Sequence, residues 1–236
     1  MAQGPQEITY EFQTKESPSR EELLEFLFNH FTCPGGETMC EALDVDRNTP
    51  GMVDDLGAFI DAGAKEPRLS VVARDSRTAA IVGYRCGCVR DVEGLAKRVA
   101  SMPERARQAM EQGQWQRSRR IHASIAVRRD VAARASELFG EEQRFHQFLL
   151  LTVHADYRRR GIARRMTQLV LRKTKEAGLK CVHAMTTTEV AGAIFESVGF
   201  EQRFSLPFAD DLDDDGRPWI VPRNGARVTA SYYKWL

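Results

Sequence analysis

Residues 148–163 read FLLLTVHADYRRRGIA, and this stretch decides the fold. The run at 147–153 predicts a buried strand, and the apolar spacing over 161–177 predicts an amphipathic helix directly after a short turn. Backbone N–H groups at a helix start lack intrahelical partners and lie at the positive end of the helix dipole. Gly161 and the small Ala163 allow a bound anion to approach the backbone closely. The segment therefore predicts a strand–turn–helix unit suited to a pyrophosphate group, with nearby arginines adding charge-assisted bonds.

Further strands and helices are predicted on both sides of this unit. Alternating or apolar runs predict strands at residues 8–13, 69–74, 79–89, 180–185 and 228–236. Helical spacing predicts helices at 17–31, 38–43, 51–62 and 189–198, the first with Ser19 as its N-cap. Residues 91–143 are rich in helical pattern, with breaks near Pro103 and Gly113, and their apolar faces are too sparse for a separate core. We expect one mixed α/β domain over residues 1–236, with at least two helices inserted at about 91–143.

Composition excludes several classes of protein. With 42% hydrophobic residues, 28% charged residues and a net charge of +1, the chain is typical of a globular protein and favours neither nucleic acid nor membrane as a partner. The N-terminal residues lack the pattern of a secretory signal, and no apolar run is long enough for a membrane helix, so we expect a cytoplasmic protein. Histidine, cysteine and aspartate spacings match no metal site, and we expect the cysteines to be reduced packing residues: Cys33, Cys40, Cys86, Cys88 and Cys181.

The segment also resembles a known family. Arg158-x-x-Gly161-x-Ala163 fits the [Gln/Arg]-x-x-Gly-x-[Gly/Ala] pattern of the GNAT superfamily of N-acetyltransferases, and SVGF at 197–200 resembles the family's terminal xxGF. The resemblance implies a three-layer fold, with a central mixed, mostly antiparallel sheet flanked by helices, and acetyl-CoA as cosubstrate without a metal. It also implies backbone contacts to the pantetheine arm from one strand and to the pyrophosphate from the following turn. The coenzyme contacts expected are Leu151, Thr152, Val153, Arg158, Arg159, Arg160, Gly161, Ile162, Ala163 and Phe195.

Finer matches resemble the arylalkylamine (dopamine-like) N-acetyltransferases of invertebrates. His30-Phe31 followed by Glu37-Thr-Met is similar to that group's FF…(D)EPL/M stretch, and the acidic tail with its PWxVP sequence is similar as well. The resemblance implies that Glu37 is the general base, acting through water. Thr187 stands where the group has its first catalytic serine, and its hydroxyl would bond the pantetheine or the departing thiol.

The sequence also departs from the group's pattern. Glu37 lacks the group's preceding Asp and following Pro, Ala191 replaces the second serine, and Phe195 replaces the tyrosine that many GNAT enzymes use as general acid. Glu37 therefore has an alternative interpretation as an ordinary surface or helix-start carboxylate. His154 has two as well, a proton relay or a residue that orients its loop.

The chemistry implied is acetyl transfer to a primary amine by direct attack in a ternary complex. An alkylammonium must lose a proton before it can attack a thioester, which is why a base at Glu37 is needed. A small arylalkylamine is the leading substrate, and the protein is expected to act as a monomer. The alternatives are acetylation of a polyamine or a protein lysine, or a catalytically weak CoA-binding regulatory protein. An acidic run at residues 210–215 keeps the polyamine alternative open.

Overall fold

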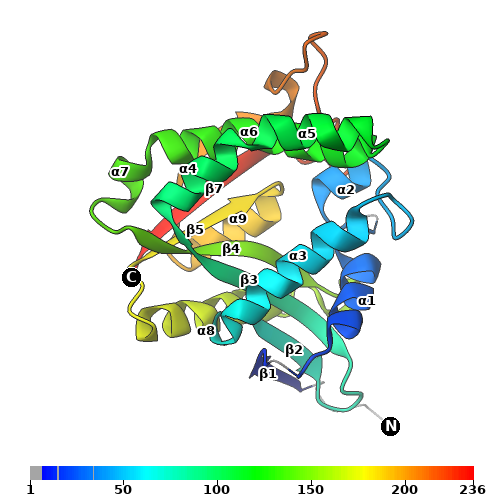
Figure 1. Ribbon diagram of the computed structural model, residues 1–236. Coiled ribbons are helices and arrows are strands. Elements are labelled where there is room, and N and C mark those ends of the chain that lie inside the picture. Colours follow the sequence, from blue (N-terminus) through cyan, green and yellow to red (C-terminus); the bar gives the residue numbers. More distant parts are fainter. Residues whose placement is uncertain (1–6, 15, 34) are drawn as a thin grey trace.

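Seven strands of the described residues form one mixed sheet, in the order β1-β2-β3-β4-β5-β7-β6 (Figure 1). The computed structural model describes residues 7–14, 16–33 and 35–236, so the N-terminal residues 1–6, which the sequence analysis used, lie outside it together with Lys15 and Pro34. The strands are β1 (Ile8–Phe12), β2 (Val71–Asp75), β3 (Ile81–Asp91), β4 (Arg144–Val153), β5 (Cys181–Thr186), β6 (Glu201–Pro207) and β7 (Val228–Trp235). The helices are α1 (Arg20–His30), α2 (Thr38–Ala42), α3 (Met52–Lys65), α4 (Val92–Ala100), α5 (Met102–Glu111), α6 (Trp115–Ala133), α7 (Ala135–Phe139), α8 (Ile162–Glu176) and α9 (Glu189–Ser197), and short 3-10 turns occur at Pro67–Leu69, Ala155–Tyr157 and Phe208–Asp210.

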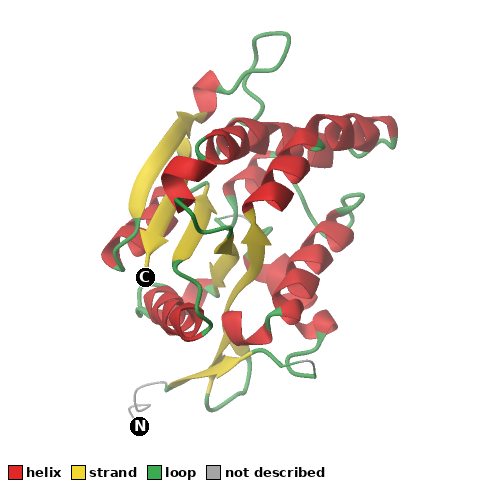
Figure 2. Ribbon diagram, turned by 60° about the vertical axis from the view of Figure 1, so that its left-hand side comes forward, coloured by secondary structure: helices red, strands yellow, loops and turns green. Residues whose placement is uncertain are grey.

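The helices form a layer on each side of the sheet (Figures 1 and 2). Apolar residues of α8 and α9 pack on one face, and those of α1, α2, α3 and α6 pack on the other together with the tail after β6. Strands β4 and β5 pair in parallel, and the remaining neighbouring pairs are antiparallel. This arrangement confirms the predicted three-layer fold with a mixed, mostly antiparallel sheet.

The two parallel strands separate part of the way along their length. Their ladder ends at the pair Phe148 and Ala184, although β4 continues to Val153 and β5 to Thr186. Past this point, no strand of the described residues pairs with the edge of β4 that faces β5. Unpaired backbone donors and acceptors at such an edge are available to a ligand.

A β-bulge lies at the same place. Gly87 of β3 faces Phe148, and the preceding β3 residue, Cys86, faces Leu150, so Leu149 is an extra residue on β4. A bulge bends its strand and increases the local twist. The bulge therefore directs the end of β4 away from β5 and opens the sheet between them.

The insert between β3 and β4 contains four helices, α4 to α7, where at least two were predicted. Both predicted breaks occur: α5 has Pro103 in its first turn, and Gly113, with a φ of 71°, separates α5 from α6. The insert shares its core with the sheet, because Leu138 and Phe139 pack with Phe145 of β4 and with β7. It lies along the top of Figure 1 as a cover over one face of the sheet.

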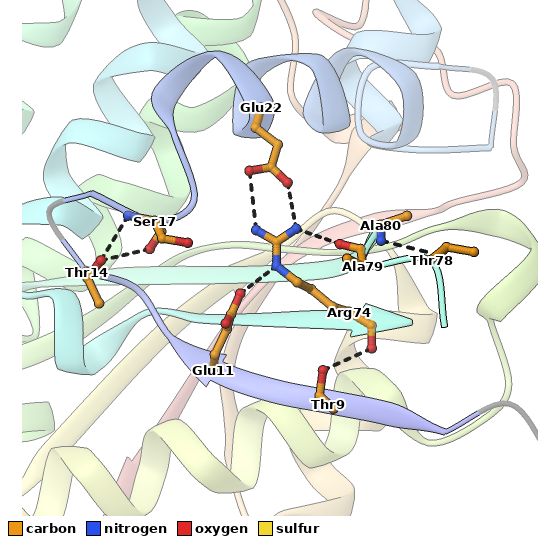
Figure 3. A network of polar contacts seen from close by, with 9 residues as sticks. All are labelled: Thr9, Glu11, Thr14, Ser17, Glu22, Arg74, Thr78, Ala79 and Ala80. Carbon is orange, nitrogen blue, oxygen red and sulfur yellow. Dashed lines mark hydrogen bonds and ion pairs between the residues drawn. The ribbon is translucent and has the colours of Figure 1, made fainter. Parts of the chain in front are cut away.

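Arg74 fixes the start of α1 relative to the first strands (Figure 3). Its guanidinium donates to Glu11 of β1 at 2.5 Å, to Glu22 of α1 at 2.6 Å and to the carbonyl of Ala79 at 2.8 Å. Ser19 caps α1 as predicted, by accepting from the Glu22 amide at 3.1 Å. The far end of α1 is thereby held in place for the loop that follows it.

Strand β4 begins earlier than the predicted strand at 147–153. His146, which precedes the predicted start, lies in β4 with no exposed surface. The strand begins at Arg144 because Phe145 faces the insert core while His146 faces α8, where its ring Nδ1 lies 2.7 Å from the hydroxyl of Thr174. The predicted strand at 147–153 was therefore short at its start.

Candidate active site

The structure brings Glu37 and Thr187 into contact. The hydroxyl of Thr187 donates to Glu37 Oε1 at 2.9 Å, although the two residues are 150 positions apart in the chain. Thr187 follows β5 directly, just beyond the place where β4 and β5 separate. Both side chains are partly exposed, so the carboxylate is held at the mouth of the opening in the sheet while remaining reachable.

The loop before α2 orients Glu37 tightly. Glu37 is the N-cap of α2, and its Oε2 accepts from the amide of Cys40 at 2.8 Å, while its own amide donates to the carbonyl of Phe31 at 2.6 Å. A Cβ at Gly36 would lie 2.3 Å from the Phe31 carbonyl oxygen, which only glycine avoids. Each carboxylate oxygen has two acceptor sites, so both bonds leave room for a proton from water or substrate.

Thr38 ties the glutamate loop to two other segments. Its hydroxyl donates to the carbonyl of Thr187 at 2.8 Å and accepts from the side-chain amide of Asn224 at 3.1 Å. A proline, which the resembled group has here, could form neither bond. The departures at Gly36 and Thr38 therefore belong to a different local arrangement that still holds the glutamate.

An almost buried guanidinium from the insert lies above the same region. Arg120 of α6 donates to Met52 Sδ at 3.2 Å and to Asp55 Oδ2 at 3.5 Å. Burial works against its charge, but interactions with Cys40, Glu37 and Asp55 outweigh burial and raise the pKa of Arg120. The insert thus supplies a fixed positive charge to the electrostatics of Glu37.

The predicted anion site has the expected backbone geometry. Gly161 is the N-cap of α8 with a φ of 76°, and a Cβ built there meets open space. Arg159 also has a positive φ, of 61°. Backbone N–H groups in a turn that alternates left-handed residues with others form a concave surface that suits an anion.

Contacts around this turn hold it against the end of the sheet. Arg158 Nε donates to the carbonyl of Val153 at 3.2 Å, and Arg160 donates to the carbonyl of Asp156 at 3.0 Å with its guanidinium over the Tyr157 ring. The Tyr157 hydroxyl donates to the buried Asp75 at 2.7 Å. This bond lowers the pKa of Asp75. The exposed side chains of Arg158 and Arg160 are therefore held beside the turn that precedes α8.

The remaining residues predicted to contact the coenzyme differ in whether their backbone or their side chain is accessible. Leu151 and Val153 lie on the unpaired part of β4, and Thr152 donates its hydroxyl to the carbonyl of His30 at 3.0 Å. Ile162 is 2% exposed and Phe195 is 3% exposed, and both side chains pack in the core between the sheet and α8. Ile162 and the partly exposed Ala163 therefore offer mainly their backbone N–H groups, and Phe195 packs against Phe148, the last β4 residue that pairs with β5.

His154 has a structural partner on each side. Its Nδ1 accepts from the amide of Asp156 at 3.1 Å, which caps the turn after β4. Its ring lies 4.1 Å from the ring of His30. Burial, together with the charges of His154 and Arg158, lowers the pKa of His30. These contacts favour the loop-orienting interpretation of His154.

The five cysteines are all free thiols, and within the described ranges no group of His, Cys, Asp and Glu is arranged to hold a metal ion. A search of the helices in the same part of the chain finds none with the length and apolar character needed to cross a membrane.

The fold and a family comparison together define the class of protein. The model of the Acetyltransferase (GNAT) family matches residues 37–200, a span that runs from the glutamate of the site to the end of the SVGF motif. The chain belongs to the GNAT acetyltransferase family, whose members use acetyl-CoA, as the sequence resemblance indicated.

Solved structures similar to this chain include amine acetyltransferases of insects. A Drosophila melanogaster polyamine N-acetyltransferase, which forms N-acetylagmatine, has a TM-score of 0.78 and 16% identity over 98% of this chain and 100% of that chain. Arylalkylamine N-acetyltransferase 2 from Aedes aegypti has a TM-score of 0.78 and 14% identity, over 97% and 98%. An agmatine N-acetyltransferase has a TM-score of 0.77 and 18% identity, over 97% and 99%. At these identities the similarity shows the shared fold.

The residues present fit acetyl-CoA. The start of α8 is open above Gly161, Arg158 stands beside it, and the unpaired edge of β4 leads from there toward Glu37 and Thr187. A diphosphate at the helix start and an extended amide-containing arm along a free strand edge each match the groups available.

Sequence reasoning missed four residues of this region. Asn224 and Arg120 reach the site from the tail and the insert, and nothing in their local sequence distinguishes them. His30 was quoted for the resemblance but not placed beside His154. Arg85 had a usable signal, because it is a single charge within the otherwise apolar stretch of β3.

Proposed function

We propose that this protein transfers an acetyl group from acetyl-CoA to the primary amine of a small arylalkylamine, by direct attack in a ternary complex. The observation that carries the proposal is the bond from Thr187 to Glu37 at the mouth of the separated strands. It places a carboxylate, oriented on both oxygens, beside the unpaired strand edge at which a thioester would lie.

Glu37 is the proposed general base. Its carboxylate attracts the substrate ammonium and takes up a proton through water, which frees the nitrogen lone pair. Thr187 and the Cys40 amide hold the carboxylate in one orientation, so little freedom is lost when the amine binds.

The cosubstrate supplies an activated acetyl group. The amine nitrogen bonds to the acyl carbon, the carbon–sulfur bond breaks, and the electron pair leaves with the thiolate of CoA. Backbone N–H groups of the segment Leu151–Val153 are proposed to polarise the carbonyl. The N–H of His154 donates to the Val82 carbonyl of β3, and alternate residues direct their N–H groups to the opposite edge, so the candidates are those of Leu151 and Val153. The turn at residues 158–163, with Phe195 beneath, is proposed to hold the rest of the coenzyme. A thiolate is a good leaving group, so a dedicated acid in place of the absent tyrosine is not required.

Release of CoA measures this activity directly. The panel consists of tryptamine, serotonin, dopamine, tyramine, phenethylamine, spermidine, agmatine and a lysine peptide. Turnover of arylalkylamines supports the proposal. Turnover of spermidine, agmatine or the peptide alone would keep the acetyl transfer and assign a different class of amine as substrate. Tight binding of acetyl-CoA with no turnover supports the alternative of a CoA-binding regulatory protein. Absence of acetyl-CoA binding contradicts the proposal. The proposal includes that the protein acts as a monomer in the cytoplasm, and light scattering of the purified protein tests the assembly state.

A polyamine or agmatine is the second candidate substrate. The structural neighbours named for agmatine and polyamine acetylation favour it, and so does one carboxylate in the acidic tail. Asp211 has a buried Oδ2 without a hydrogen-bond partner among the described residues, and burial raises its pKa to about 6. The second cationic group of agmatine or a polyamine would supply the partner that this carboxylate lacks. Asp211→Asn should then raise KM for agmatine and leave KM for tyramine unchanged.

A further inference from the structure

Arg85 is a buried arginine without an acceptor. It lies on β3 with 1% of its surface exposed, and none of its three guanidinium nitrogens has a hydrogen-bond partner anywhere in the described chain. The guanidinium carbon lies 3.2 Å from the centre of the Phe148 ring. Burial lowers the pKa of Arg85 to about 9, which still leaves the side chain charged at neutral pH. A cation held this way lacks the carboxylate that buried charges ordinarily have.

Two buried titratable neighbours, Cys86 and His146, do not neutralise this charge. Burial raises the pKa of the Cys86 thiol to about 12, so the thiol is protonated at neutral pH. The Thr174 hydroxyl donates to the carbonyl of Val170 at 2.8 Å, so its oxygen accepts from His146 Nδ1 at 2.7 Å. His146 is therefore protonated on Nδ1, and its buried Nε2 has no partner among the described residues. Burial, and then the charge of Arg85, lower the pKa of His146 well below its usual range. The imidazole is neutral, and the positive charge of Arg85 remains uncompensated.

The charge is located behind the opening in the sheet. Arg85 pairs with Leu151 across the β3–β4 ladder, and its guanidinium covers Phe148, the last residue of β4 that pairs with β5. These two β4 residues flank the bulge at Leu149 and Leu150. Arg85 therefore lies against the back of the strand segment whose free edge faces the reacting thioester in the proposed function.

We infer that Arg85 stabilises the negative charge that develops on the carbonyl oxygen of the acyl group at this edge. The inference rests on the proposed function. Fixed charges in a water-excluded site act strongly on charge that forms during the reaction, because they need no reorganisation. At an effective dielectric of about 20 and a separation of roughly 8 Å, Coulomb's law corresponds to a rate effect of about 30-fold. The charge acts through space, so Arg85 need not touch the substrate.

A stability measurement separates this role from a purely structural one. If the contact of Arg85 with Phe148 stabilised the core, as a packing clamp would, replacing Arg85 would lower the free energy of unfolding. If Arg85 is an unpaired buried charge, the charge itself destabilises the fold, and an apolar residue of similar length raises the free energy of unfolding. Arg85→Met should therefore raise the thermal unfolding midpoint of the ligand-free protein while lowering kcat by about 10-fold to 30-fold. KM for acetyl-CoA should change by less than about threefold, and Arg85→Lys should retain most of kcat.

The matched control is Arg90→Met on the same strand. Arg90 donates to the side chain of Gln147 at 3.2 Å and should leave kcat unchanged. A kcat of Arg85→Met within threefold of the parent would overturn the inference. So would a lowered unfolding midpoint with activity lost in proportion to folded protein, because that result identifies a packing clamp.

A binding measurement tests the charge without turnover. S-carboxymethyl-CoA carries a carboxylate near the position of the acetyl carbonyl. By calorimetry, Arg85→Met should weaken its binding by about tenfold relative to acetyl-CoA, and an equal effect on the two ligands would contradict the inference. If the parent protein binds acetyl-CoA but acetylates no amine, the proposed function fails while this comparison still decides the role of Arg85.

Discussion

Replacing Glu37 with glutamine separates its two roles, because glutamine keeps the shape and loses the base. The Glu37 side chain accepts from the Cys40 amide at 2.8 Å and from the Thr187 hydroxyl at 2.9 Å. A glutamine oxygen can still accept from the amide, and its NH₂ can donate to the Thr187 hydroxyl oxygen after that hydroxyl rotates. The capping interaction is preserved in part, so the free energy of unfolding should fall by about 1 kcal/mol or less.

The effect on catalysis should be much larger. Loss of a general base lowers rates by roughly 10²–10⁴-fold. An alkylamine with a pKa near that of lysine is deprotonated to about 0.1% at pH 7.5, so the glutamine variant must rely on this small neutral fraction. Its kcat/KM should therefore rise close to tenfold with each pH unit until the amine itself titrates, whereas the parent enzyme should level off at lower pH.

The assay is initial-rate CoA release with tyramine from pH 6 to pH 10, for Glu37→Gln and for Glu41→Gln as matched control. Glu41 lies on the same short helix and accepts from the Gly35 amide at 3.1 Å, without contact to Thr187 in the described structure. Its variant should retain parental rates and the parental pH profile. Rates for Glu37→Gln within threefold of the parent, or superimposable pH profiles, would refute the assignment of Glu37 as base.

Three further outcomes are expected. Thr187→Val should lower kcat by about tenfold, because it removes the bond to Glu37, and Thr187→Ser should restore it in steady-state assays. Gly161→Ala and Gly178→Ala should each destabilise the protein by about 1 kcal/mol in urea unfolding, because both glycines have a positive φ with open space at Cβ, but only Gly161→Ala should weaken acetyl-CoA binding in calorimetry. Burial raises the pKa of Asp211 from 3.8 to about 6, so its ionisation destabilises the fold progressively as pH rises between these two values, and fully above them. Asp211→Asn should add roughly 1 kcal/mol at pH 8, after allowance for solvent screening, and almost nothing at about pH 3; equal effects at both pH values would contradict this origin.

Local features of the fold were predictable because short-range physics determines them. The strand, turn and helix around Gly161 follow from an apolar run, a glycine that adopts a positive φ, and helical spacing after it. The Ser19 cap and the breaks at Pro103 and Gly113 follow from residue-specific backbone preferences in the same way. None of these depends on where the rest of the chain lies.

Long-range contacts were not predictable in the same way. The approach of Glu37 to Thr187 depends on the sheet order and on where β4 and β5 separate. The bulge at Leu149 changes which face each later β4 residue occupies, and the alternation of an apolar strand does not reveal it. Arg120 reaches the site through the packing of the insert, whose helix boundaries were visible only in outline. The family resemblance implied a separate catalytic role for Glu37 and for Thr187, but only the folded structure shows that the two side chains are in contact.

The departures from the family pattern around Glu37 form one connected arrangement. Gly36 permits the tight turn that places the Glu37 amide on the Phe31 carbonyl. The hydroxyl of Thr38 then joins this turn to the carbonyl of Thr187, whose own hydroxyl bonds the Glu37 carboxylate. The glutamate loop and the end of β5 are thus linked by two hydroxyls, since Thr38 donates to Thr187 and Thr187 donates to Glu37. Because each bond fixes the geometry of the next, single substitutions at residues 36, 38 and 187 should be strongly non-additive, and the double variant T38V/T187V should lose less activity than the product of the single losses.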